Sequence, residues 1–315
     1  MKFVRRVLGG LVLAAALAIF PASSQAADQV IRIGFQKYGN LILLKATGDL
    51  EKKLAPLGYK VAWTEFPSGP PLLEALNAGA IDFGHAGEAP PIFAQAAGVP
   101  FVYVAHEPPA PLGEAILVPK DSPIKTVADL KGKKVALNKG SNVHYLLVKA
   151  LEKAGVKYSE IEPVFLAPAD ARAAFERGSV DAWVIWDPFQ AAAEAATGAR
   201  TIANGTGLVA NHQFYLATQS FSDAHPQVTD AVLAALSDID RWANDNSHAV
   251  AEQLSAGIGI PAPILEIALK RQAYGIKPLD DNVIAEQQRI ADTFFTLGLL
   301  PKAVTVSSIV RKTGS

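Results

Sequence analysis

Two acidic residues, Glu88 and Asp187, occupy equivalent places in two similar segments of the chain. Each lies six positions after an aspartate, Asp82 or Asp181, so the two segments are offset by 99 positions. Each follows a short apolar run and precedes an alanine-rich helical run that has proline near its start. A carboxylate at such a turn either caps the next helix or accepts a hydrogen bond or an ammonium group from a ligand. The sequence leaves both roles open.

A second pair of matching turns carries neutral polar residues. Gln36 and Asn40 frame one turn, and Ser141 and Asn142 lie in the other, at an offset of 102 positions. A helix that starts at such a turn presents free N–H groups and the positive end of its dipole, which together bind anions. Small residues such as Gly87 allow a ligand to approach the backbone. The alternative is that Asn40, Ser141 or Asn142 only caps its helix.

Two tryptophans precede the second acidic turn. We expect Trp186, nearer the turn, to form a wall against the alkyl part of a ligand, and Trp183 to lie in the core; a core position is the alternative for Trp186.

Reactive motifs are missing from the sequence. The six histidines have no metal-binding spacing and there is no cysteine, so we expect no metal site and no cofactor. Walker, Gly-x-Ser-x-Gly, Gly-x-Gly-x-x-Gly and His-Glu-x-x-His motifs are also absent. These absences favour a binding protein over an enzyme.

Strands and helices alternate along most of the chain, which predicts an α/β fold with mostly parallel sheets. We expect strands over 30–35, 59–66, 99–105, 114–118, 201–203 and 214–217, and helices over 41–54, 72–78, 92–97, 228–244, 249–256, 263–274 and 282–296. The helices after position 227 are expected to return and cover the first half. Ligands of open α/β sheets bind at the carboxyl ends of the strands, where the four turns lie.

The repeat divides the chain into two lobes. About 290 residues after the leader exceed the usual size of one domain. We expect residues 27–115 and 217–315 to form a discontinuous first lobe and residues 116–216 a second. The two connecting segments near Glu114–Val118 and Phe214–Thr218 would form a two-strand hinge.

The first residues describe a secretory signal. Lys2, Arg5 and Arg6 precede an apolar run, and small residues end at Ala26, so residues 1–26 read as a cleavable signal peptide; an uncleaved anchor is the alternative. Removing them leaves 26 of the 29 basic residues against 30 acidic ones, a balance that excludes a basic surface for nucleic acid. Without cysteine there is no site for a lipoprotein anchor. We therefore expect a protein free in the periplasm.

Long segments of the chain resemble the periplasmic aliphatic sulfonate-binding proteins of ABC importers, within the nitrate, sulfonate and taurine-binding group. These segments are Gly69–Gly79, Pro90–Gly98, Ser122–Gly132, Pro168–Phe175 and Val180–Pro188. The resemblance implies a type II periplasmic binding protein that is monomeric and non-catalytic. Its lobes would close on an alkanesulfonate and then dock on a permease and its ATPase. By position, it also implies a sulfonate site at Gln36, Asn40, Gly87, Glu88, Ser141, Asn142, Trp186 and Asp187.

Other functions stay open at this point. Taurine, nitrate, a sulfate ester or another small organic anion could take the place of the sulfonate. An enzyme on the same scaffold would need a converging acid and base, and only Glu88 and Asp187 offer such a pair.

Overall fold

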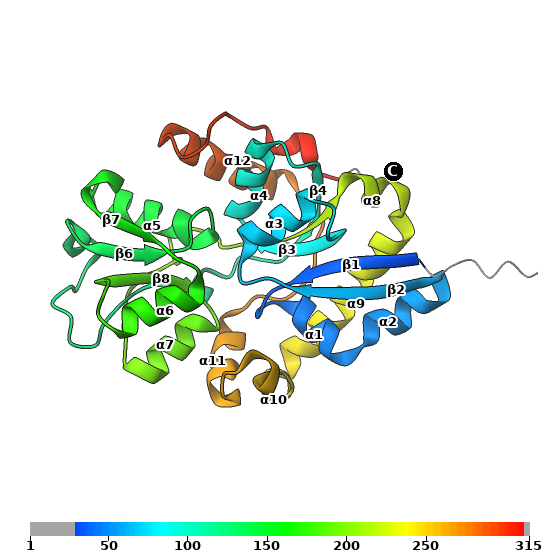
Figure 1. Ribbon diagram of the computed structural model, residues 1–315, viewed down its shortest axis with the longest axis horizontal. Helices are drawn as coiled ribbons and strands as arrows, with labels where there is room; N and C mark the ends of the chain where they lie inside the picture. The colour runs from blue at the N-terminus through cyan, green and yellow to red at the C-terminus, as the bar shows by residue number, and fades with distance from the viewer. Residues whose placement is uncertain (1–28, 312–315) are drawn as a thin grey trace, which may run out of the picture.

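The computed structural model describes residues 29–311 and folds into two lobes, each built on a five-stranded sheet with helices above and below it (Figure 1). The expected signal peptide, residues 1–26, lies outside the described residues. In order across the first sheet, the strands are β2 (Tyr59–Glu65), β1 (Gln29–Phe35), β3 (Phe83–Gly87), β10 (Gln213–Thr218) and β4 (Phe101–His106). In the second sheet they are β7 (Glu162–Phe165), β6 (Lys134–Leu137), β8 (Ala182–Trp186), β5 (Glu114–Val118) and β9 (Arg200–Asn204).

The two sheets have the same plan, which confirms the internal repeat. In each, the first three strands pair in parallel, and a single antiparallel strand, β10 or β5, lies between the third strand and the edge. Strands β4, β5 and β8 are buried along their whole length. Helices on both faces explain why these strands read as continuous apolar runs rather than alternating ones.

The chain passes between the lobes twice, through residues 107–113 and 205–212. Each antiparallel strand follows one of these crossings, so β5 joins the second sheet from Glu114 and β10 joins the first sheet from Gln213. The boundaries proposed from the sequence, 115/116 and 216/217, therefore fall inside these strands.

Twelve α-helices are present within residues 29–311. They are α1 (Asn40–Thr47), α2 (Asp49–Leu54), α3 (Gly69–Asn77), α4 (Ala89–Ala97), α5 (Asn142–Lys153), α6 (Pro168–Glu176), α7 (Phe189–Thr197), α8 (Gln219–Ala224), α9 (Pro226–Asp245), α10 (Ser247–Ile258), α11 (Ala262–Arg271) and α12 (Asp281–Thr296). The prediction of one helix over 41–54 was wrong, because Gly48 adopts a left-handed conformation with φ 66° and ends α1 there. Helix α3 starts three residues earlier than predicted, because prolines fit its first turn.

The C-terminal helices cover the first lobe, as predicted, and also reach the second. Helix α9 packs on α1 and α2, and α12 packs on α4. Helix α11, however, packs on α7 of the second lobe, below the gap between the sheets in Figure 1. Phe294 of α12 also contacts His144 and Tyr145 of α5, so the tail bridges the two lobes through both α11 and α12.

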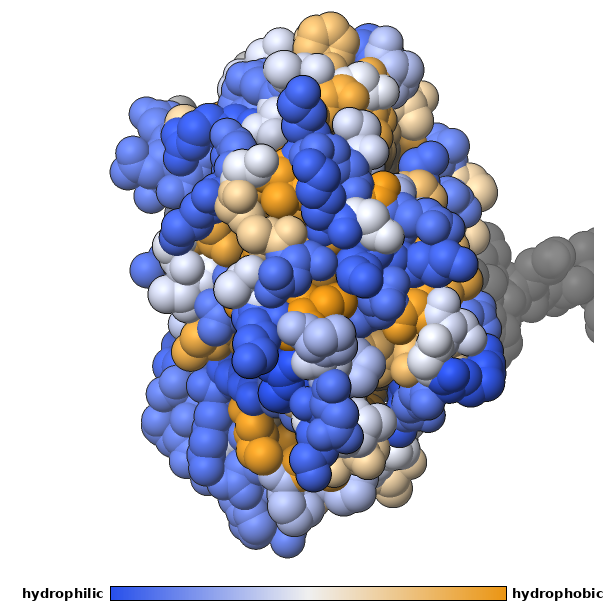
Figure 2. Space-filling view, turned by 90° about the vertical axis from the view of Figure 1, so that its left-hand side faces the viewer, coloured by the Kyte–Doolittle hydropathy of each residue, from blue (hydrophilic) through white to orange (hydrophobic). Residues whose placement is uncertain are grey.

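Figure 2 shows the end of the second lobe, where hydrophilic residues cover most of the surface and hydrophobic ones form small separate patches. Within residues 29–311, no helix has both the length and the apolar character needed to cross a bilayer.

Candidate functional site

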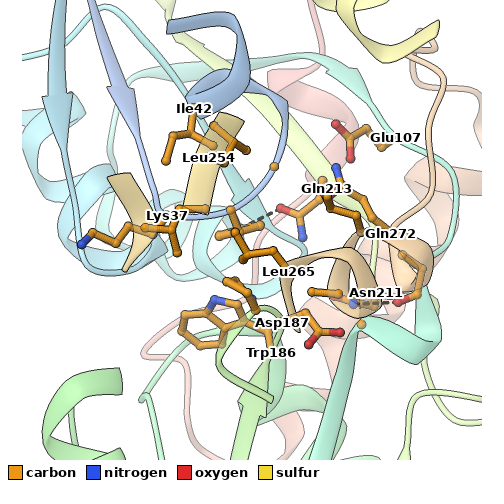
Figure 3. Close-up of a pocket in the computed structure, with 18 of the residues that line it drawn as sticks. Lys37, Ile42, Glu107, Trp186, Asp187, Asn211, Gln213, Leu254, Leu265 and Gln272 are labelled. Atoms are coloured by element: carbon orange, nitrogen blue, oxygen red, sulfur yellow. Dashed lines mark hydrogen bonds between the residues drawn. The ribbon is translucent and has the colours of Figure 1, made fainter. Parts of the chain in front are cut away.

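A cavity lies between the two lobes, and part of it is open to solvent (Figure 3). Its walls come from the turn after β1, both crossing segments, the end of β8 and the helices α10 and α11. Because both lobes and both crossings contribute, a molecule in the cavity would contact every part that moves when the lobes close.

The cavity is apolar at one end and polar at the other (Figure 3). The apolar part is formed by Ile42, Trp186, Leu254, Ile258, Leu265, Ala268 and Leu269. The polar part is formed by Glu107, Asn142, Asn211, Gln213 and Gln272. Such a lining fits a ligand with a hydrocarbon chain and one hydrogen-bonding head group.

Two helix N-termini reach the cavity without a side-chain cap. Gly39, with φ 72°, precedes α1, and Ser141 precedes α5; neither N-cap position has a side-chain capping bond. The first-turn N–H groups of α1 and α5 are therefore left for a ligand, except that of His144, which donates to the main-chain oxygen of Ser141 at 3.0 Å. The alternative in which Asn40, Ser141 or Asn142 caps its helix is wrong, because these side chains bind elsewhere.

The two asparagines hold the floor of the cavity together. Asn40 Nδ2 donates to Glu107 Oε1 at 3.2 Å and to Asp240. Asn142 Nδ2 donates to Glu114 Oε2 at 2.6 Å and to Asn211 Oδ1 at 3.1 Å. With both amide hydrogens used in each case, the asparagine side chains position the floor rather than donate to a ligand.

Gly87 permits the close approach of the two lobes. A Cβ atom at Gly87, on the first lobe, would lie 2.9 Å from Cβ of Asn142 on the second. Any larger residue would push the lobes apart. Gly87 is thus a contact between the lobes and does not line the cavity.

In the part of the chain that the structure describes, no lysine or arginine directs its charge into the cavity. Lys37 is the only one among the lining residues, and its Nζ lies 3.9 Å from Glu65 and points away from the cavity (Figure 3). An anion would therefore be held by neutral donors and by the helix N-termini.

Gln213 offers one such neutral donor. Burial raises the pKa of Tyr38 well above its usual range, so the hydroxyl stays protonated. That hydroxyl donates to Gln213 Oε1 at 2.7 Å, which fixes the orientation of the amide. The Gln213 Nε2 has no hydrogen bond to any residue in 29–311, and it belongs to a side chain that lines the cavity.

The structure brings three of the eight residues expected at the site into the cavity wall, namely Asn142, Trp186 and Asp187. The other five, Gln36, Asn40, Gly87, Glu88 and Ser141, are buried but do not line it. Gln36 donates to the main-chain oxygen of His85 at 3.0 Å, and Ser141 Oγ donates to the main-chain oxygen of Asn138 at 2.7 Å.

Glu88 does not cap α4, although it occupies the N-cap position. Pro90 and Pro91 lie in the first turn and have no N–H groups for the carboxylate to accept from. Glu88 Oε2 instead accepts from the main-chain N–H of His212 at 3.1 Å, and Oε1 has no partner. Burial, above all, raises the pKa of Glu88 to about 8.

Asp187 both caps α7 and forms an ion pair. Its Oδ1 accepts from the N–H of Ala191 at 3.0 Å, while Pro188 follows a cis peptide bond and takes the N-cap position rather than the expected first helical position. Arg271, the last residue of α11, places Nη1 3.4 Å from Asp187 Oδ2 and Nη2 2.7 Å from Glu194 Oε2. Arg271 of the C-terminal helices therefore balances the charge of Asp187.

Several lining residues were not predicted from the sequence. Asn211 and Gln213 lie in a polar stretch, 204–213, that reads as an ordinary loop. The spacing of apolar residues in α10 and α11 indicated burial but not the partner surface. Within residues 29–311, no group of three or more histidine, aspartate or glutamate side chains is arranged to hold a metal ion.

Comparison with known proteins identifies the family. The NMT1/THI5 like family model matches residues 60–246. A protein of Escherichia coli (strain K12) named for aliphatic sulfonates binding is 45% identical over 307 residues, which cover 97% of this chain and 95% of that protein. The chain belongs to the NMT1/THI5-like family. A Bacillus subtilis (strain 168) protein of the same name is 33% identical and covers 90% of the chain.

Solved structures agree with this assignment. The alkanesulfonate-binding protein SsuA of Xanthomonas axonopodis pv. citri, bound to MOPS, has a TM-score of 0.88 and 42% identity, covering 91% of this NMT1/THI5-like chain and all (100%) of SsuA. The periplasmic aliphatic sulphonate binding protein SsuA of Escherichia coli has a TM-score of 0.83 and 44% identity, over 91% and 93% of the two chains. The two-lobed fold and the resemblance to the aliphatic sulfonate-binding group are thus confirmed.

The fold alone does not decide between binding and catalysis. The desulfurization enzyme DSZB shares it, at 18% identity and a TM-score of 0.65. The relatives that share more than 40% of their residues with this family member are binding proteins.

We predict that Arg271→Gln weakens ligand binding about tenfold, or roughly 1.4 kcal/mol, because Asp187 and Glu194 are left as two unpaired acids where α11 meets the second lobe. The loss should appear as faster ligand dissociation in stopped-flow fluorescence. Arg172→Gln, which removes an exposed ion pair with Glu176 in α6, is the matched control and should change nothing. Equal effects of the two variants would contradict a closing role for Arg271.

We predict that stability falls as pH rises, in part through Glu88. An unfolded chain releases a glutamate proton near about 4.3, whereas folded Glu88 keeps its proton to about 8. Between these values the folded protein holds more protons, so the free energy of unfolding decreases with pH. Glu88→Gln should raise the melting midpoint at pH 8.5 by about 2–4 °C and leave it unchanged at pH 4.

Calorimetric or fluorescence melting checks this, with Glu176→Gln, an exposed acid of α6, as control. A gain in Glu88→Gln that is the same at both pH values would show that proton release plays no part.

Proposed function

We propose that this protein is the periplasmic solute-binding component of an ABC importer and that it captures aliphatic sulfonates between its lobes. The main support for this proposal is that the cavity has an apolar end and a polar end. Within residues 29–311, no cationic side chain is directed into it. The alkyl chain would lie against Trp186 and the leucines of α10 and α11. The sulfonate would lie at the polar end, near the first turns of α1 and α5.

The similar proteins support this choice of ligand. Both SsuA structures are named for alkanesulfonate or aliphatic sulphonate binding, and one contains MOPS. MOPS combines a sulfonate with a propyl chain and a ring, which suits a lining of the kind present here.

Taurine and nitrate fit the cavity less well. The ammonium group of taurine needs a free acceptor near the apolar end, and Asp187 is already paired with Arg271. Nitrate has no hydrocarbon to cover the seven apolar lining residues.

We further propose that the ligand leaves chemically unchanged. Glu88 and Asp187 were the one acid and base pair that the sequence offered, and Glu88 does not line the cavity. Incubation of the protein with hexanesulfonate, followed by mass spectrometry, should recover only hexanesulfonate. Release of sulfite would support an enzyme instead.

In the cell, the protein would be exported and would act together with membrane partners. Residues 1–26 would direct export to the periplasm, where the protein would act as a monomer, and the closed form would dock on a membrane permease coupled to an ATPase. The lobes proposed from the sequence, 27–115 with 217–315 and 116–216, would close around the crossing segments.

We predict that affinity rises with chain length from ethanesulfonate upward, by about 0.8 kcal/mol per methylene group, until the apolar end is filled. Titration calorimetry on ligand-free protein measures this directly. Nitrate and sulfate are expected to bind weakly. A series in which affinity is independent of chain length would contradict the placement of the alkyl chain.

Matched variants of α11 locate the effect. Leu265→Ala should weaken binding of hexanesulfonate several-fold but leave ethanesulfonate unchanged, since Leu265 lines the apolar end. Ile267→Ala, on the same helix but 47% exposed, should have no effect on either ligand.

A further inference from the structure

Glu107 is an acid at the polar end of a cavity that we propose binds an anion. The residue directly follows β4, on the first crossing segment, and is 2% exposed. Its main-chain N–H donates to the main-chain oxygen of Gln213 at 2.9 Å, so the two residues are neighbours. Both side chains line the cavity (Figure 3). As a carboxylate, Glu107 would repel the proposed ligand.

Both hydrogen bonds to the Glu107 carboxyl group are accepted by the same oxygen, Oε1. Oε1 accepts from the hydroxyl of Tyr215 at 2.5 Å and from Asn40 Nδ2 at 3.2 Å. Oε2 has no hydrogen-bond partner within residues 29–311. With both donors on Oε1, a proton on the carboxyl group belongs on Oε2, where it can be donated into the cavity.

Among residues 29–311, no cation near Glu107 would hold its carboxyl group ionised. The acid Asp240 of α9 shares Asn40 with it, and Tyr38, Tyr215 and Tyr274 are the phenols nearby. His106 and His212 direct Nδ1 to the main-chain oxygen of Glu107 rather than to its carboxyl group. Burial first, and Asp240 second, raise the pKa of Glu107 to about 8. A buried charge without a partner is costly, so the neutral form is the stable one.

We propose that Glu107 is a specificity-determining residue that binds the ligand in its protonated form, donating from Oε2 to an oxygen of the sulfonate beside the Nε2 donor of Gln213. This inference rests on the proposed function. A sulfonate only accepts hydrogen bonds, so a neutral carboxyl group is matched to it, whereas an ionised one excludes it. Closure over the ligand then requires the proton, and binding takes up a proton wherever the open form has lost it.

The experiment is titration of the full mature protein with hexanesulfonate from pH 6 to pH 9.5, in pairs of buffers that differ in ionisation enthalpy. For the wild type we expect proton uptake on binding and an affinity that falls about tenfold per pH unit once Glu107 ionises. Glu107→Gln should bind within a few-fold of the wild type at pH 6, because its amide oxygen can accept from Tyr215 and Asn40 and its nitrogen can donate to the ligand. Its affinity should stay flat to pH 9.5 and show no proton uptake.

Glu88→Gln is the matched control, since Glu88 is also buried but does not line the cavity; it should keep the proton uptake of the wild type. Loss of the uptake in Glu88→Gln, or its persistence in Glu107→Gln, would overturn the assignment to Glu107. Tight binding by the wild type with no proton uptake in any buffer would overturn it even if Glu107→Gln failed to fold. No binding of hexanesulfonate at any pH would instead overturn the proposed function, and this inference with it.

Discussion

The two crossings of the chain between the lobes are the constraint on which the rest of the structure depends. Each sheet is completed by a strand that arrives from the other lobe, β5 through residues 107–113 and β10 through residues 205–212. An antiparallel strand enters a parallel sheet at the edge where its neighbours end, so both crossings must pass the carboxyl ends of the strands. The residues beside these crossings, Glu107 and Gln213 among them, therefore form the floor of the cavity whatever their type.

The repeat produces two similar lobes, but small differences between them give the two equivalent acids, Glu88 and Asp187, different partners. At the end of β3, Pro90 and Pro91 deprive Glu88 of partners in the helix, and the acid turns toward the crossing segment at His212. At the equivalent end of β8, Asp187 retains the N–H of Ala191 and gains Arg271 from the tail. One acid thus becomes a buried neutral group and the other a charged link to the C-terminal helices. Equal positions in a repeat do not imply equal chemistry.

The sequence predicted the fold well because its signals are local and repeated. Strand and helix periods, glycine stops and the offset near 100 positions all depend on neighbours in the chain. The cavity was harder to predict, since most of its apolar wall comes from α10 and α11, which begin more than 40 residues after the last residue of the second sheet, Asn204, in a tail whose partner surface no local pattern reveals. Glu88 shows a second reason why the site was harder to predict than the fold. The position of a carboxylate before a helix predicts a cap, but the two prolines decide whether an N–H exists to be capped.

If the cavity closes on an anion, as we propose, neutral donors can hold that anion without leaving an unpaired charge in the protein. A lysine aimed inward would be buried without a partner whenever the lobes closed without a ligand, at a cost of several kcal/mol by the usual order of magnitude. Helix N-termini and the Gln213 amide provide donors that carry no net side-chain charge in either form, and the Glu107 carboxyl group, as we propose, joins them when it is protonated. Charge is instead placed where the lobes meet outside the head-group end, at Arg271 with Asp187 and Glu194, where each ion already has its partner. Under this proposal the tail of helices would control closure, while the floor would control which anion is accepted.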